Sequence, residues 1–263
     1  MAQNIKVSIV GAGNVAWHLA PELDNAGFVV QEVYSRNAKN AEALVKRLYQ
    51  AEVKHDLDFS SSDSNVFIVA VPDDYIEEVA MEIALPDEAI LVHTSGSKPL
   101  SALGYSATEH IGVFYPLQTF SKAKSVVFRD IPICIETENK STKSTLIKIA
   151  QSISSVVKSI DSKDRKALHV AAVFACNFTN HLFTISKEIL NDKSLDFELL
   201  KPLIVETINK GLMIGPENAQ TGPAKRGDME TLDHHMQYLQ FNEGYMEIYK
   251  TITQHILDTY SNE

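Results

Sequence analysis

The feature that most constrains this chain is a glycine turn directly after its first apolar run. The run from Ile5 to Val10 leads straight into Gly11-Ala12-Gly13-Asn14-Val15-Ala16. In a G-x-G-x-x-G/A turn the first two glycines permit a tight bend and close approach of the backbone, and the small third position lets the next helix pack on the sheet. Free N–H groups at the start of that helix can hold a pyrophosphate. The pattern therefore predicts a strand, a dinucleotide-binding turn and a helix; the alternative is an ordinary tight turn.

The residues that follow the second predicted strand indicate which dinucleotide binds. An acidic side chain at the end of that strand would hydrogen-bond an unmodified ribose. Here the strand is followed by Ser35, Arg36 and Asn37. A guanidinium can meet a ribose 2′-phosphate with two charge-assisted hydrogen bonds, so the sequence predicts NADP(H) rather than NAD(H). Two alternatives stay open: a register shifted by two positions would bring Glu32 to the ribose, and Arg36 would otherwise be a solvated loop charge.

Composition limits the class of protein. With 263 residues, 44% of them hydrophobic, the chain can form one large domain or two ordinary ones, and we expect two. A formal net charge of −10 without a basic cluster argues against nucleic-acid binding. Cys134 and Cys176 form neither a metal-ligand spacing nor a disulfide framework, so we expect a reducing compartment. His234 and His235 are adjacent, so their side chains would diverge on a helix, and no third ligand is spaced with them; we therefore expect no metal. The first residues lack the basic region of a signal peptide and no apolar run approaches a membrane span; we therefore expect a cytoplasmic protein with no membrane contact.

Apolar runs of strand length alternate with helical patterns over residues 1–161 and then stop. This alternation predicts an α/β fold with a doubly wound, mostly parallel sheet. The expected strands are Lys6 to Val10, Val29 to Val33, Asn65 to Val71, Ala89 to His93, Ile111 to Phe114, Ile131 to Ile135 and Val156 to Ser159. Residues 162–263 are predicted to form a smaller, all-helical substrate domain, with helices from Lys163 to about Asn191, from Phe197 to Ile214 and two more, and with a long functional loop at 215–228.

The carboxyl ends of parallel strands form the ligand-binding edge of such a sheet. The run from Val66 to Val71 is apolar on both faces, as a central strand should be, and its end is expected to border the nicotinamide. Thr94 and Ser95 follow the next strand, although a simple Ser/Gly turn before Pro99 is the alternative there. The candidate cofactor-binding residues are Gly11, Gly13, Asn14, Val15, Ser35, Arg36, Asn37, Val71, Pro72, Thr94 and Ser95.

Catalytic candidates lie mainly in the helical half. At 100° per residue, His169, Asn177, Asn180 and His181 share about a third of the helix circumference. His169 is the titratable group best placed for proton transfer at neutral pH, the alternative being a histidine that only completes core hydrogen bonds. Arg226 follows Thr221-Gly222-Pro223 and could hold a carboxylate or phosphate, while Asp228 is expected to cap the next helix. The catalytic candidates are His169, Ser95, Asn177 and Arg226.

The chain resembles a bacterial family of NADP oxidoreductases that joins a Rossmann-like domain to an uncharacterised helical domain. The resemblance spans nearly the whole length and rests on Gly11 to Ala16, His93 to Gly96, Tyr115 to Phe120, His169 to Ala175 and Thr221 to Asp228. The wider group is similar to pyrroline-5-carboxylate reductases, ketopantoate reductases and 6-phosphogluconate or β-hydroxyacid dehydrogenases. It implies NAD(P) hydride transfer, a helical C-terminal domain and often a dimer. The catalytic lysine of the β-hydroxyacid dehydrogenases, with an asparagine one turn on, is not evident, and His169 occupies that region.

We therefore predict an NADP(H)-dependent oxidoreductase that transfers hydride to or from a C=O or C=N bond of a small, acid-like metabolite. His169 or a bound water would supply the proton, and the helical domain would form a homodimer. The alternative is an NADP(H)-binding sensor or regulatory protein that performs no chemistry, because the fold alone does not establish catalysis.

Overall fold

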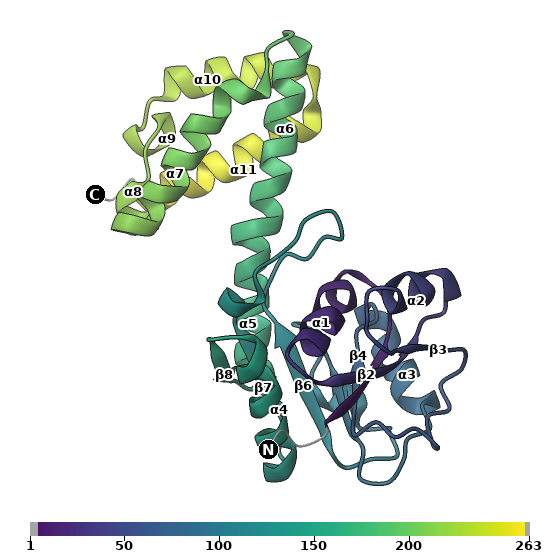
Figure 1. Ribbon diagram of the computed structural model, residues 1–263. Helices are drawn as coiled ribbons and strands as arrows, with labels where there is room; N and C mark the ends of the chain where they lie inside the picture. Colours follow the sequence, from purple (N-terminus) through teal and green to yellow (C-terminus); the bar gives the residue numbers. More distant parts are fainter. Residues whose placement is uncertain (1–4, 261–263) are drawn as a thin grey trace. The chain divides into compact units, whose positions relative to one another are not determined.

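The protein consists of two compact units, of which the first ends at Cys176 and the second begins at Asn177. The computed structural model describes residues 5–260 (Figure 1). The units divide inside a π-helical segment, Val173–Phe178, that follows helix α5 (Ser162–Ala172). The domain boundary at 161/162 expected from the sequence instead coincides with the start of α5, and it stays a prediction.

The first unit contains an eight-stranded sheet in the order β3-β2-β1-β4-β5-β6-β7-β8. All neighbouring strands are parallel except β6 and β7, which confirms the α/β, doubly wound and mostly parallel sheet. All seven expected strands are present, and the one that was missed, β3, has only three residues. The strands are β1 (Lys6–Val10), β2 (Val29–Tyr34), β3 (Glu52–Lys54), β4 (Val66–Val69), β5 (Ile90–His93), β6 (Ile111–Pro116), β7 (Ile133–Glu136) and β8 (Val157–Ser159).

Helices cover both faces of this sheet. Side chains of a strand alternate between faces, so Val7 and Ile9 of β1 pack into one hydrophobic cluster and Val10 packs into another. The first cluster includes residues of helices α1 (Asn14–Asn25), α2 (Ala38–Val45) and α4 (Lys140–Ile153). The second includes residues of α3 (Ile76–Glu82) and of the short helix η2 (Leu100–Leu103). Two more short helices, η1 (Asp73–Tyr75) and η3 (Phe128–Asp130), connect strands.

The glycine turn joins β1 to α1 as predicted, and its two glycines have different reasons to lack a side chain. Gly11 has φ of +112°, and a Cβ there would lie 2.4 Å from the Ala70 carbonyl oxygen, so the fold itself requires glycine. At Gly13 a Cβ would meet the same oxygen only at 3.9 Å, an ordinary contact. The fold thus has room for a side chain at Gly13, and because glycine has none, that space is available to a ligand.

The second unit is helical throughout its described residues. It contains α6 (Thr179–Asp192), η5 (Phe197–Leu200), α7 (Lys201–Ile214), α8 (Pro216–Ala219), α9 (Pro223–Arg226), α10 (Met229–Tyr238), η6 (Leu239–Phe241) and α11 (Glu243–Tyr260). The expectation of a plain loop at 215–228 is wrong, because α8 and α9 lie there. Each begins with a proline directly after a glycine of positive φ, and proline is pre-organised for the first helical position.

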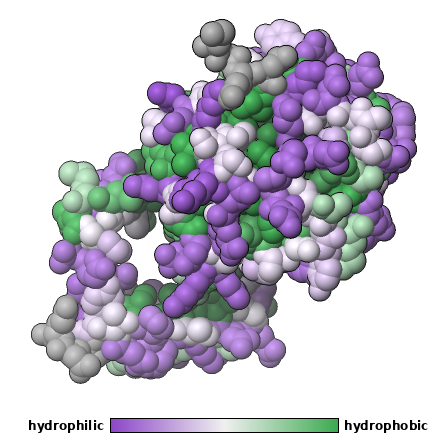
Figure 2. Space-filling view, turned by 90° about the horizontal axis from the view of Figure 1, so that it is seen from below, coloured by the Kyte–Doolittle hydropathy of each residue, from purple (hydrophilic) through white to green (hydrophobic). Residues whose placement is uncertain are grey.

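The second unit buries few of its apolar side chains. Among its described residues only Ile185, Ala224, Leu232 and Leu239 are buried hydrophobics, and α7 buries none. Leu212 and Met213 of α7 are 82% and 83% exposed. Figure 2 shows apolar residues reaching the surface between hydrophilic ones. Exposed apolar patches of this kind mark interaction surfaces. The homodimer expected through this unit stays a prediction, and α7 is the surface on which to test it.

The helical stretch from Ser162 to Asp192 differs from one expectation. It is long and apolar enough to cross a membrane by length and composition. The expectation that no stretch approaches such a span was based on uninterrupted apolar runs. The mean hydropathy of a longer window can still be high when a few His and Asn side chains interrupt the apolar residues. One such helix is weak evidence for a membrane protein, and only 6% of its most apolar window is buried. In α5, Arg165 is buried and Leu168 packs against a cluster of sheet residues.

Candidate active site

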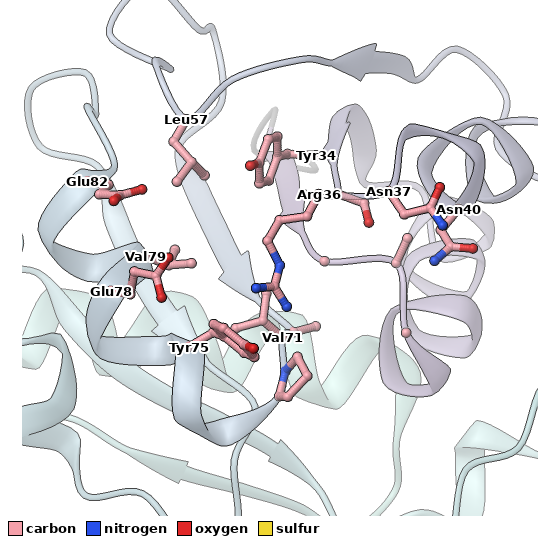
Figure 3. Close-up of a pocket in the computed structure, with 16 residues that line it drawn as sticks. Tyr34, Arg36, Asn37, Asn40, Leu57, Val71, Tyr75, Glu78, Val79 and Glu82 are labelled. Carbon is pink, nitrogen blue, oxygen red and sulfur yellow. The ribbon is translucent and has the colours of Figure 1, made fainter.

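A first pocket of about 290 Å³ lies at the carboxyl ends of β1, β2 and β4. Its lining includes the glycine turn and, because β2 ends at Tyr34, the loop residues Ser35, Arg36 and Asn37. The Arg36 guanidinium carbon lies 3.6 Å from the centre of the Tyr75 ring (Figure 3). This cation–π contact orients the guanidinium within the pocket. A hydroxyl, a guanidinium and an amide therefore stand together at the end of β2.

The register of β2 excludes the alternative at Glu32. This residue lies within the strand, and its carboxylate accepts hydrogen bonds from the Ser8 hydroxyl at 2.7 Å and from the Ser62 hydroxyl. Glu32 does not line the first pocket, whereas Arg36 does. Asn37 precedes α2 and caps it, because its side-chain oxygen accepts from the Lys39 N–H at 3.1 Å. The carboxylate is thus engaged inside the sheet and the guanidinium is at its edge.

A second pocket, of about 340 Å³, adjoins the first. The two share Gly13, Ala70, Val71 and Pro72 in their linings. The second also contains Asn14, Val15, Asp73, Thr94, Ser95, Gly96, Tyr115, Pro116, Gln118, Phe120 and His169. Because the pockets meet at the glycine turn and the end of β4, an extended dinucleotide could occupy both, as ligands of doubly wound sheets do at a topological switch point.

A tyrosine and a histidine meet in the second pocket. A hydrogen bond of 3.1 Å joins the Tyr115 hydroxyl to His169 Nδ1. A Cβ added at Gly96 would lie 2.6 Å from His169 Nδ1 and 2.7 Å from Tyr115 Cζ, so this pair requires glycine beside it. Burial raises the pKa of Tyr115 to about 12, so the hydroxyl gives up its proton less readily than an exposed tyrosine does. The pocket thus holds a hydroxyl and an imidazole that are joined by a hydrogen bond.

A buried ion pair positions the helix that carries His169. Arg165, one turn before His169 on α5, is 1% exposed and its guanidinium pairs with the Glu136 carboxylate at the end of β7. Its other N–H groups donate to the carbonyl oxygens of Ser95, at 3.2 Å, and Lys98. Glu136 also accepts from the backbone N–H of Ser162, the first residue of α5, at 3.0 Å. The pair joins α5, β7 and the loop after β5.

His93 holds the same loop but is not placed for acid–base chemistry. Its Nδ1 accepts from the Ser95 N–H at 3.1 Å, and its Nε2 donates to the Pro99 carbonyl at 3.2 Å. Burial lowers the pKa of His93 from 6.5 to about 4, and the charge of Arg165 acts in the same direction. His93 is therefore neutral at physiological pH and stabilises the turn that carries Thr94 and Ser95.

The structure places every candidate cofactor-binding residue in one of the two pockets. Gly11, Gly13, Ser35, Arg36, Asn37, Val71 and Pro72 line the first, and Asn14, Val15, Thr94 and Ser95 line the second. Of the catalytic candidates, His169 and Ser95 lie in the second pocket. Asn177 and Arg226 are exposed residues of the second unit. The roles assigned to all these residues stay predictions.

Two local expectations of the helical half have different outcomes. Asp228 caps α10 as predicted: its carboxylate accepts from the Thr231 side chain and N–H, and these hydrogen bonds lower the pKa of Asp228. The prediction that His169, Asn177, Asn180 and His181 share one helix face assumed an uninterrupted α-helix. The π-helical segment Val173–Phe178 lies between His169 and Asn180, and each of its residues turns the helix by a smaller angle, so that spacing argument fails.

The sequence did not lead us to Tyr75 or Tyr115 as site residues, whereas Gly96 was considered with Ser95 as a possible backbone donor to the substrate or nicotinamide. Their positions near strand ends could have indicated both tyrosines. Tyr115 is the last residue but one of β6, and Tyr75 lies in η1, shortly after the end of β4. The rule that strand ends form the ligand edge was applied only to residues with obvious polar chemistry. The contact between Tyr115 and His169, 54 residues apart, has no signal in local sequence.

These features define a protein of the Rossmann-like, dinucleotide-binding class. The family described as "Rossmann-like domain" matches residues 1–110, and the family described as "Domain of unknown function (DUF2520)" matches residues 131–256. The crystal structure of "putative NADP oxidoreductase BF3122" from Bacteroides fragilis is 36% identical, with 97% of this chain and 98% of that chain covered and a TM-score of 0.89. The chain belongs to this family of oxidoreductases, in which a Rossmann-like domain precedes a DUF2520 domain.

More distant structures share the fold. Protein TM1727 from Thermotoga maritima is 25% identical, with 96% of this chain and 98% of that chain covered and a TM-score of 0.69. A reductive aminase from Aspergillus terreus, solved with NADPH and ethyl-5-oxohexanoate, is 13% identical, with 98% and 95% covered and a TM-score of 0.70. No curated protein matches the chain.

Replacing Arg165 by methionine should lower the free energy of unfolding by about 3–5 kcal/mol, because Glu136 would then be a partly buried carboxylate without a cation. The exposed pair Lys201–Glu198 supplies the control, and Lys201→Met should cost less than about 1 kcal/mol. Urea unfolding of both variants measures the difference. Equal effects would show that removing the buried cation costs no more than removing an exposed one, which would contradict the prediction.

Stability should fall in mild acid because of His93. Its folded-state pKa of about 4 lies below the unfolded value of 6.5, so between these values only the unfolded chain binds the proton. The contribution is fully present above pH 6.5 and is lost as the pH falls towards 4, by about 3 kcal/mol in total. Urea unfolding at several pH values measures the slope. His93→Gln should flatten it and the exposed-site variant His55→Gln should not; a slope unchanged by His93→Gln would contradict this assignment.

Proposed function

We propose that the protein is an NADP(H)-dependent oxidoreductase that transfers hydride to or from a C=O or C=N bond of a small, acid-like metabolite in the cytoplasm. The observation that carries this proposal is Arg36, held over the Tyr75 ring in the pocket that also contains the glycine turn. The similarity, at 36% identity, to a protein described as a "putative NADP oxidoreductase" supports the class of reaction.

The residues of the first pocket fit a phosphorylated dinucleotide. No side chain caps α1, so the N–H groups of its first turn are free to bind a pyrophosphate. Gly13 leaves room for that group, since the protein does not need the space a side chain would occupy. Arg36 would pair with the ribose 2′-phosphate through two N–H groups, and Ser35 and Asn37 would add a hydroxyl and an amide.

The second pocket would hold the nicotinamide and the substrate. When bound, the nicotinamide donates or accepts the hydride. Val71, Pro72 and Thr94 would pack around it, and the Ser95 hydroxyl would orient the substrate oxygen or nitrogen. His169 is the proposed general acid, with a bound water as the alternative, and the Tyr115 hydroxyl hydrogen-bonds its Nδ1. Proton transfer from a positioned imidazole suits catalysis near neutral pH.

Calorimetric titration with NADPH and NADH tests the cofactor. The wild type should bind NADPH more tightly, and Arg36→Ala should weaken NADPH binding by about tenfold to a hundredfold while NADH binding is unchanged, because only NADPH carries the 2′-phosphate. Arg129→Ala, an exposed arginine in η3, is the matched control. A wild type that binds neither nucleotide would overturn the proposal.

Turnover distinguishes an enzyme from a sensor that binds the cofactor without chemistry. NADPH oxidation should be followed with 2-keto acids and cyclic imino acids as substrates. His169→Ala should lower kcat by about 10²- to 10⁴-fold without changing NADPH affinity, and the exposed-site variant His55→Ala should leave both unchanged. If the wild type binds NADPH but none of these compounds oxidises it, the sensor function is favoured.

A further inference from the structure

We propose that Lys122, on the loop between β6 and η3, is a second cationic ligand of the cofactor and binds its pyrophosphate. This inference rests on the proposed function, because it adds a residue to the same dinucleotide site. Lys122 lies more than a hundred residues from the glycine turn in sequence, and neither the glycine motif nor the residues at the end of β2 point to it.

The loop is anchored on the first turns of α1. His18 Nε2 donates to the Ser121 carbonyl at 2.9 Å, and the rings of His18 and Phe120 stack with their centres 5.5 Å apart. A tight turn follows, in which the Lys124 N–H donates to the Ser121 carbonyl at 3.2 Å. Lys122 therefore stands at the tip of a turn whose base is fixed to the helix that begins at the glycine motif.

The Lys122 ammonium contacts the glycine motif directly. Its Nζ donates to the carbonyl oxygen of Ala12 at 3.0 Å, and it lies 4.8 Å from the centre of the Trp17 ring. Ala12 stands between Gly11 and Gly13, next to the N–H groups at the start of α1. Within residues 5–260 no carboxylate forms an ion pair with Lys122, whose ammonium contacts a neutral carbonyl and an aromatic ring.

The charges around the pockets explain why a second cation is needed. Among the lining residues of the two pockets, Arg36 is the only lysine or arginine, and Asp73, Glu78 and Glu82 contribute carboxylates. Lys122 is not a lining residue; it lies beside the first pocket, where it contacts the carbonyl of Ala12, a residue of the lining. A pyrophosphate adds further negative charge, and the amino end of α1 offers about half a positive charge. Arg36 is assigned to the 2′-phosphate at the end of β2. Lys122 supplies a full positive charge beside the glycine turn, where the pyrophosphate is assigned.

The test compares two nucleotides that share the pyrophosphate and differ in the 2′-phosphate. Lys122→Met should raise the Kd of NADPH and of NADH by the same factor, about tenfold, whereas Arg36→Ala affects NADPH alone. Lys124→Met, in the same turn, should bind both nucleotides like the wild type, and Lys122→Arg should restore most of the affinity. Adenosine 2′-monophosphate lacks the pyrophosphate, so it should bind the wild type and Lys122→Met equally.

Each other result has a definite meaning. If Lys122→Met binds both nucleotides within twofold of the wild type, or weakens NADPH alone, Lys122 is not a pyrophosphate ligand although the proposed function stands. If adenosine 2′-monophosphate binding and the thermal midpoint fall as well, Lys122 acts on the structure of the turn and the inference is overturned. If the wild type binds neither nucleotide, the proposed function fails and this inference with it.

Discussion

The buried pair of Arg165 and Glu136 is the interaction on which the site depends most. It lies where three segments meet: the start of α5, the end of β7 and the loop that follows β5. A buried ion pair gains little over well-packed apolar side chains, yet each partner is costly to leave alone, so the arrangement specifies one geometry rather than adding stability. That geometry places His169 beside Tyr115 and Gly96, at the pocket where the nicotinamide is expected.

The two units differ in how far they bury their apolar side chains. In the first, clusters on both faces of the sheet fix the strand ends, and the loops at those ends carry the chemistry. The second holds four buried hydrophobic residues among those described, and α7 contributes none. A rigid scaffold supports precise sites. It is therefore reasonable that every candidate cofactor contact lies in the first unit, where side-chain positions are fixed by packing.

Local patterns predicted most of the fold. The lengths and spacing of the apolar runs identified seven strands. The glycine turn, the Asp228 cap and the loop after β2 followed from the chemistry of neighbouring residues. The misses have physical causes. β3 pairs only three residues, α8 and α9 are single turns started by prolines, and a π-helical segment changes the phase of a helix without an obvious sequence signal. Contacts such as Tyr115 with His169, or Lys122 with Ala12, join distant segments and could not be derived from spacing.

The carboxylates around the pockets, together with a formal net charge of −10, also affect how fast a nucleotide arrives. At long range the protein repels a polyanion, whereas at short range the helix terminus and the two cations attract it. Dissolved salt screens the long-range repulsion over about 10 Å at 0.1 M but weakens close contacts less. Moderate ionic strength should therefore accelerate association of the proposed cofactor while leaving the bound complex nearly as tight, so that nucleotide binding would be faster in salt than in dilute buffer.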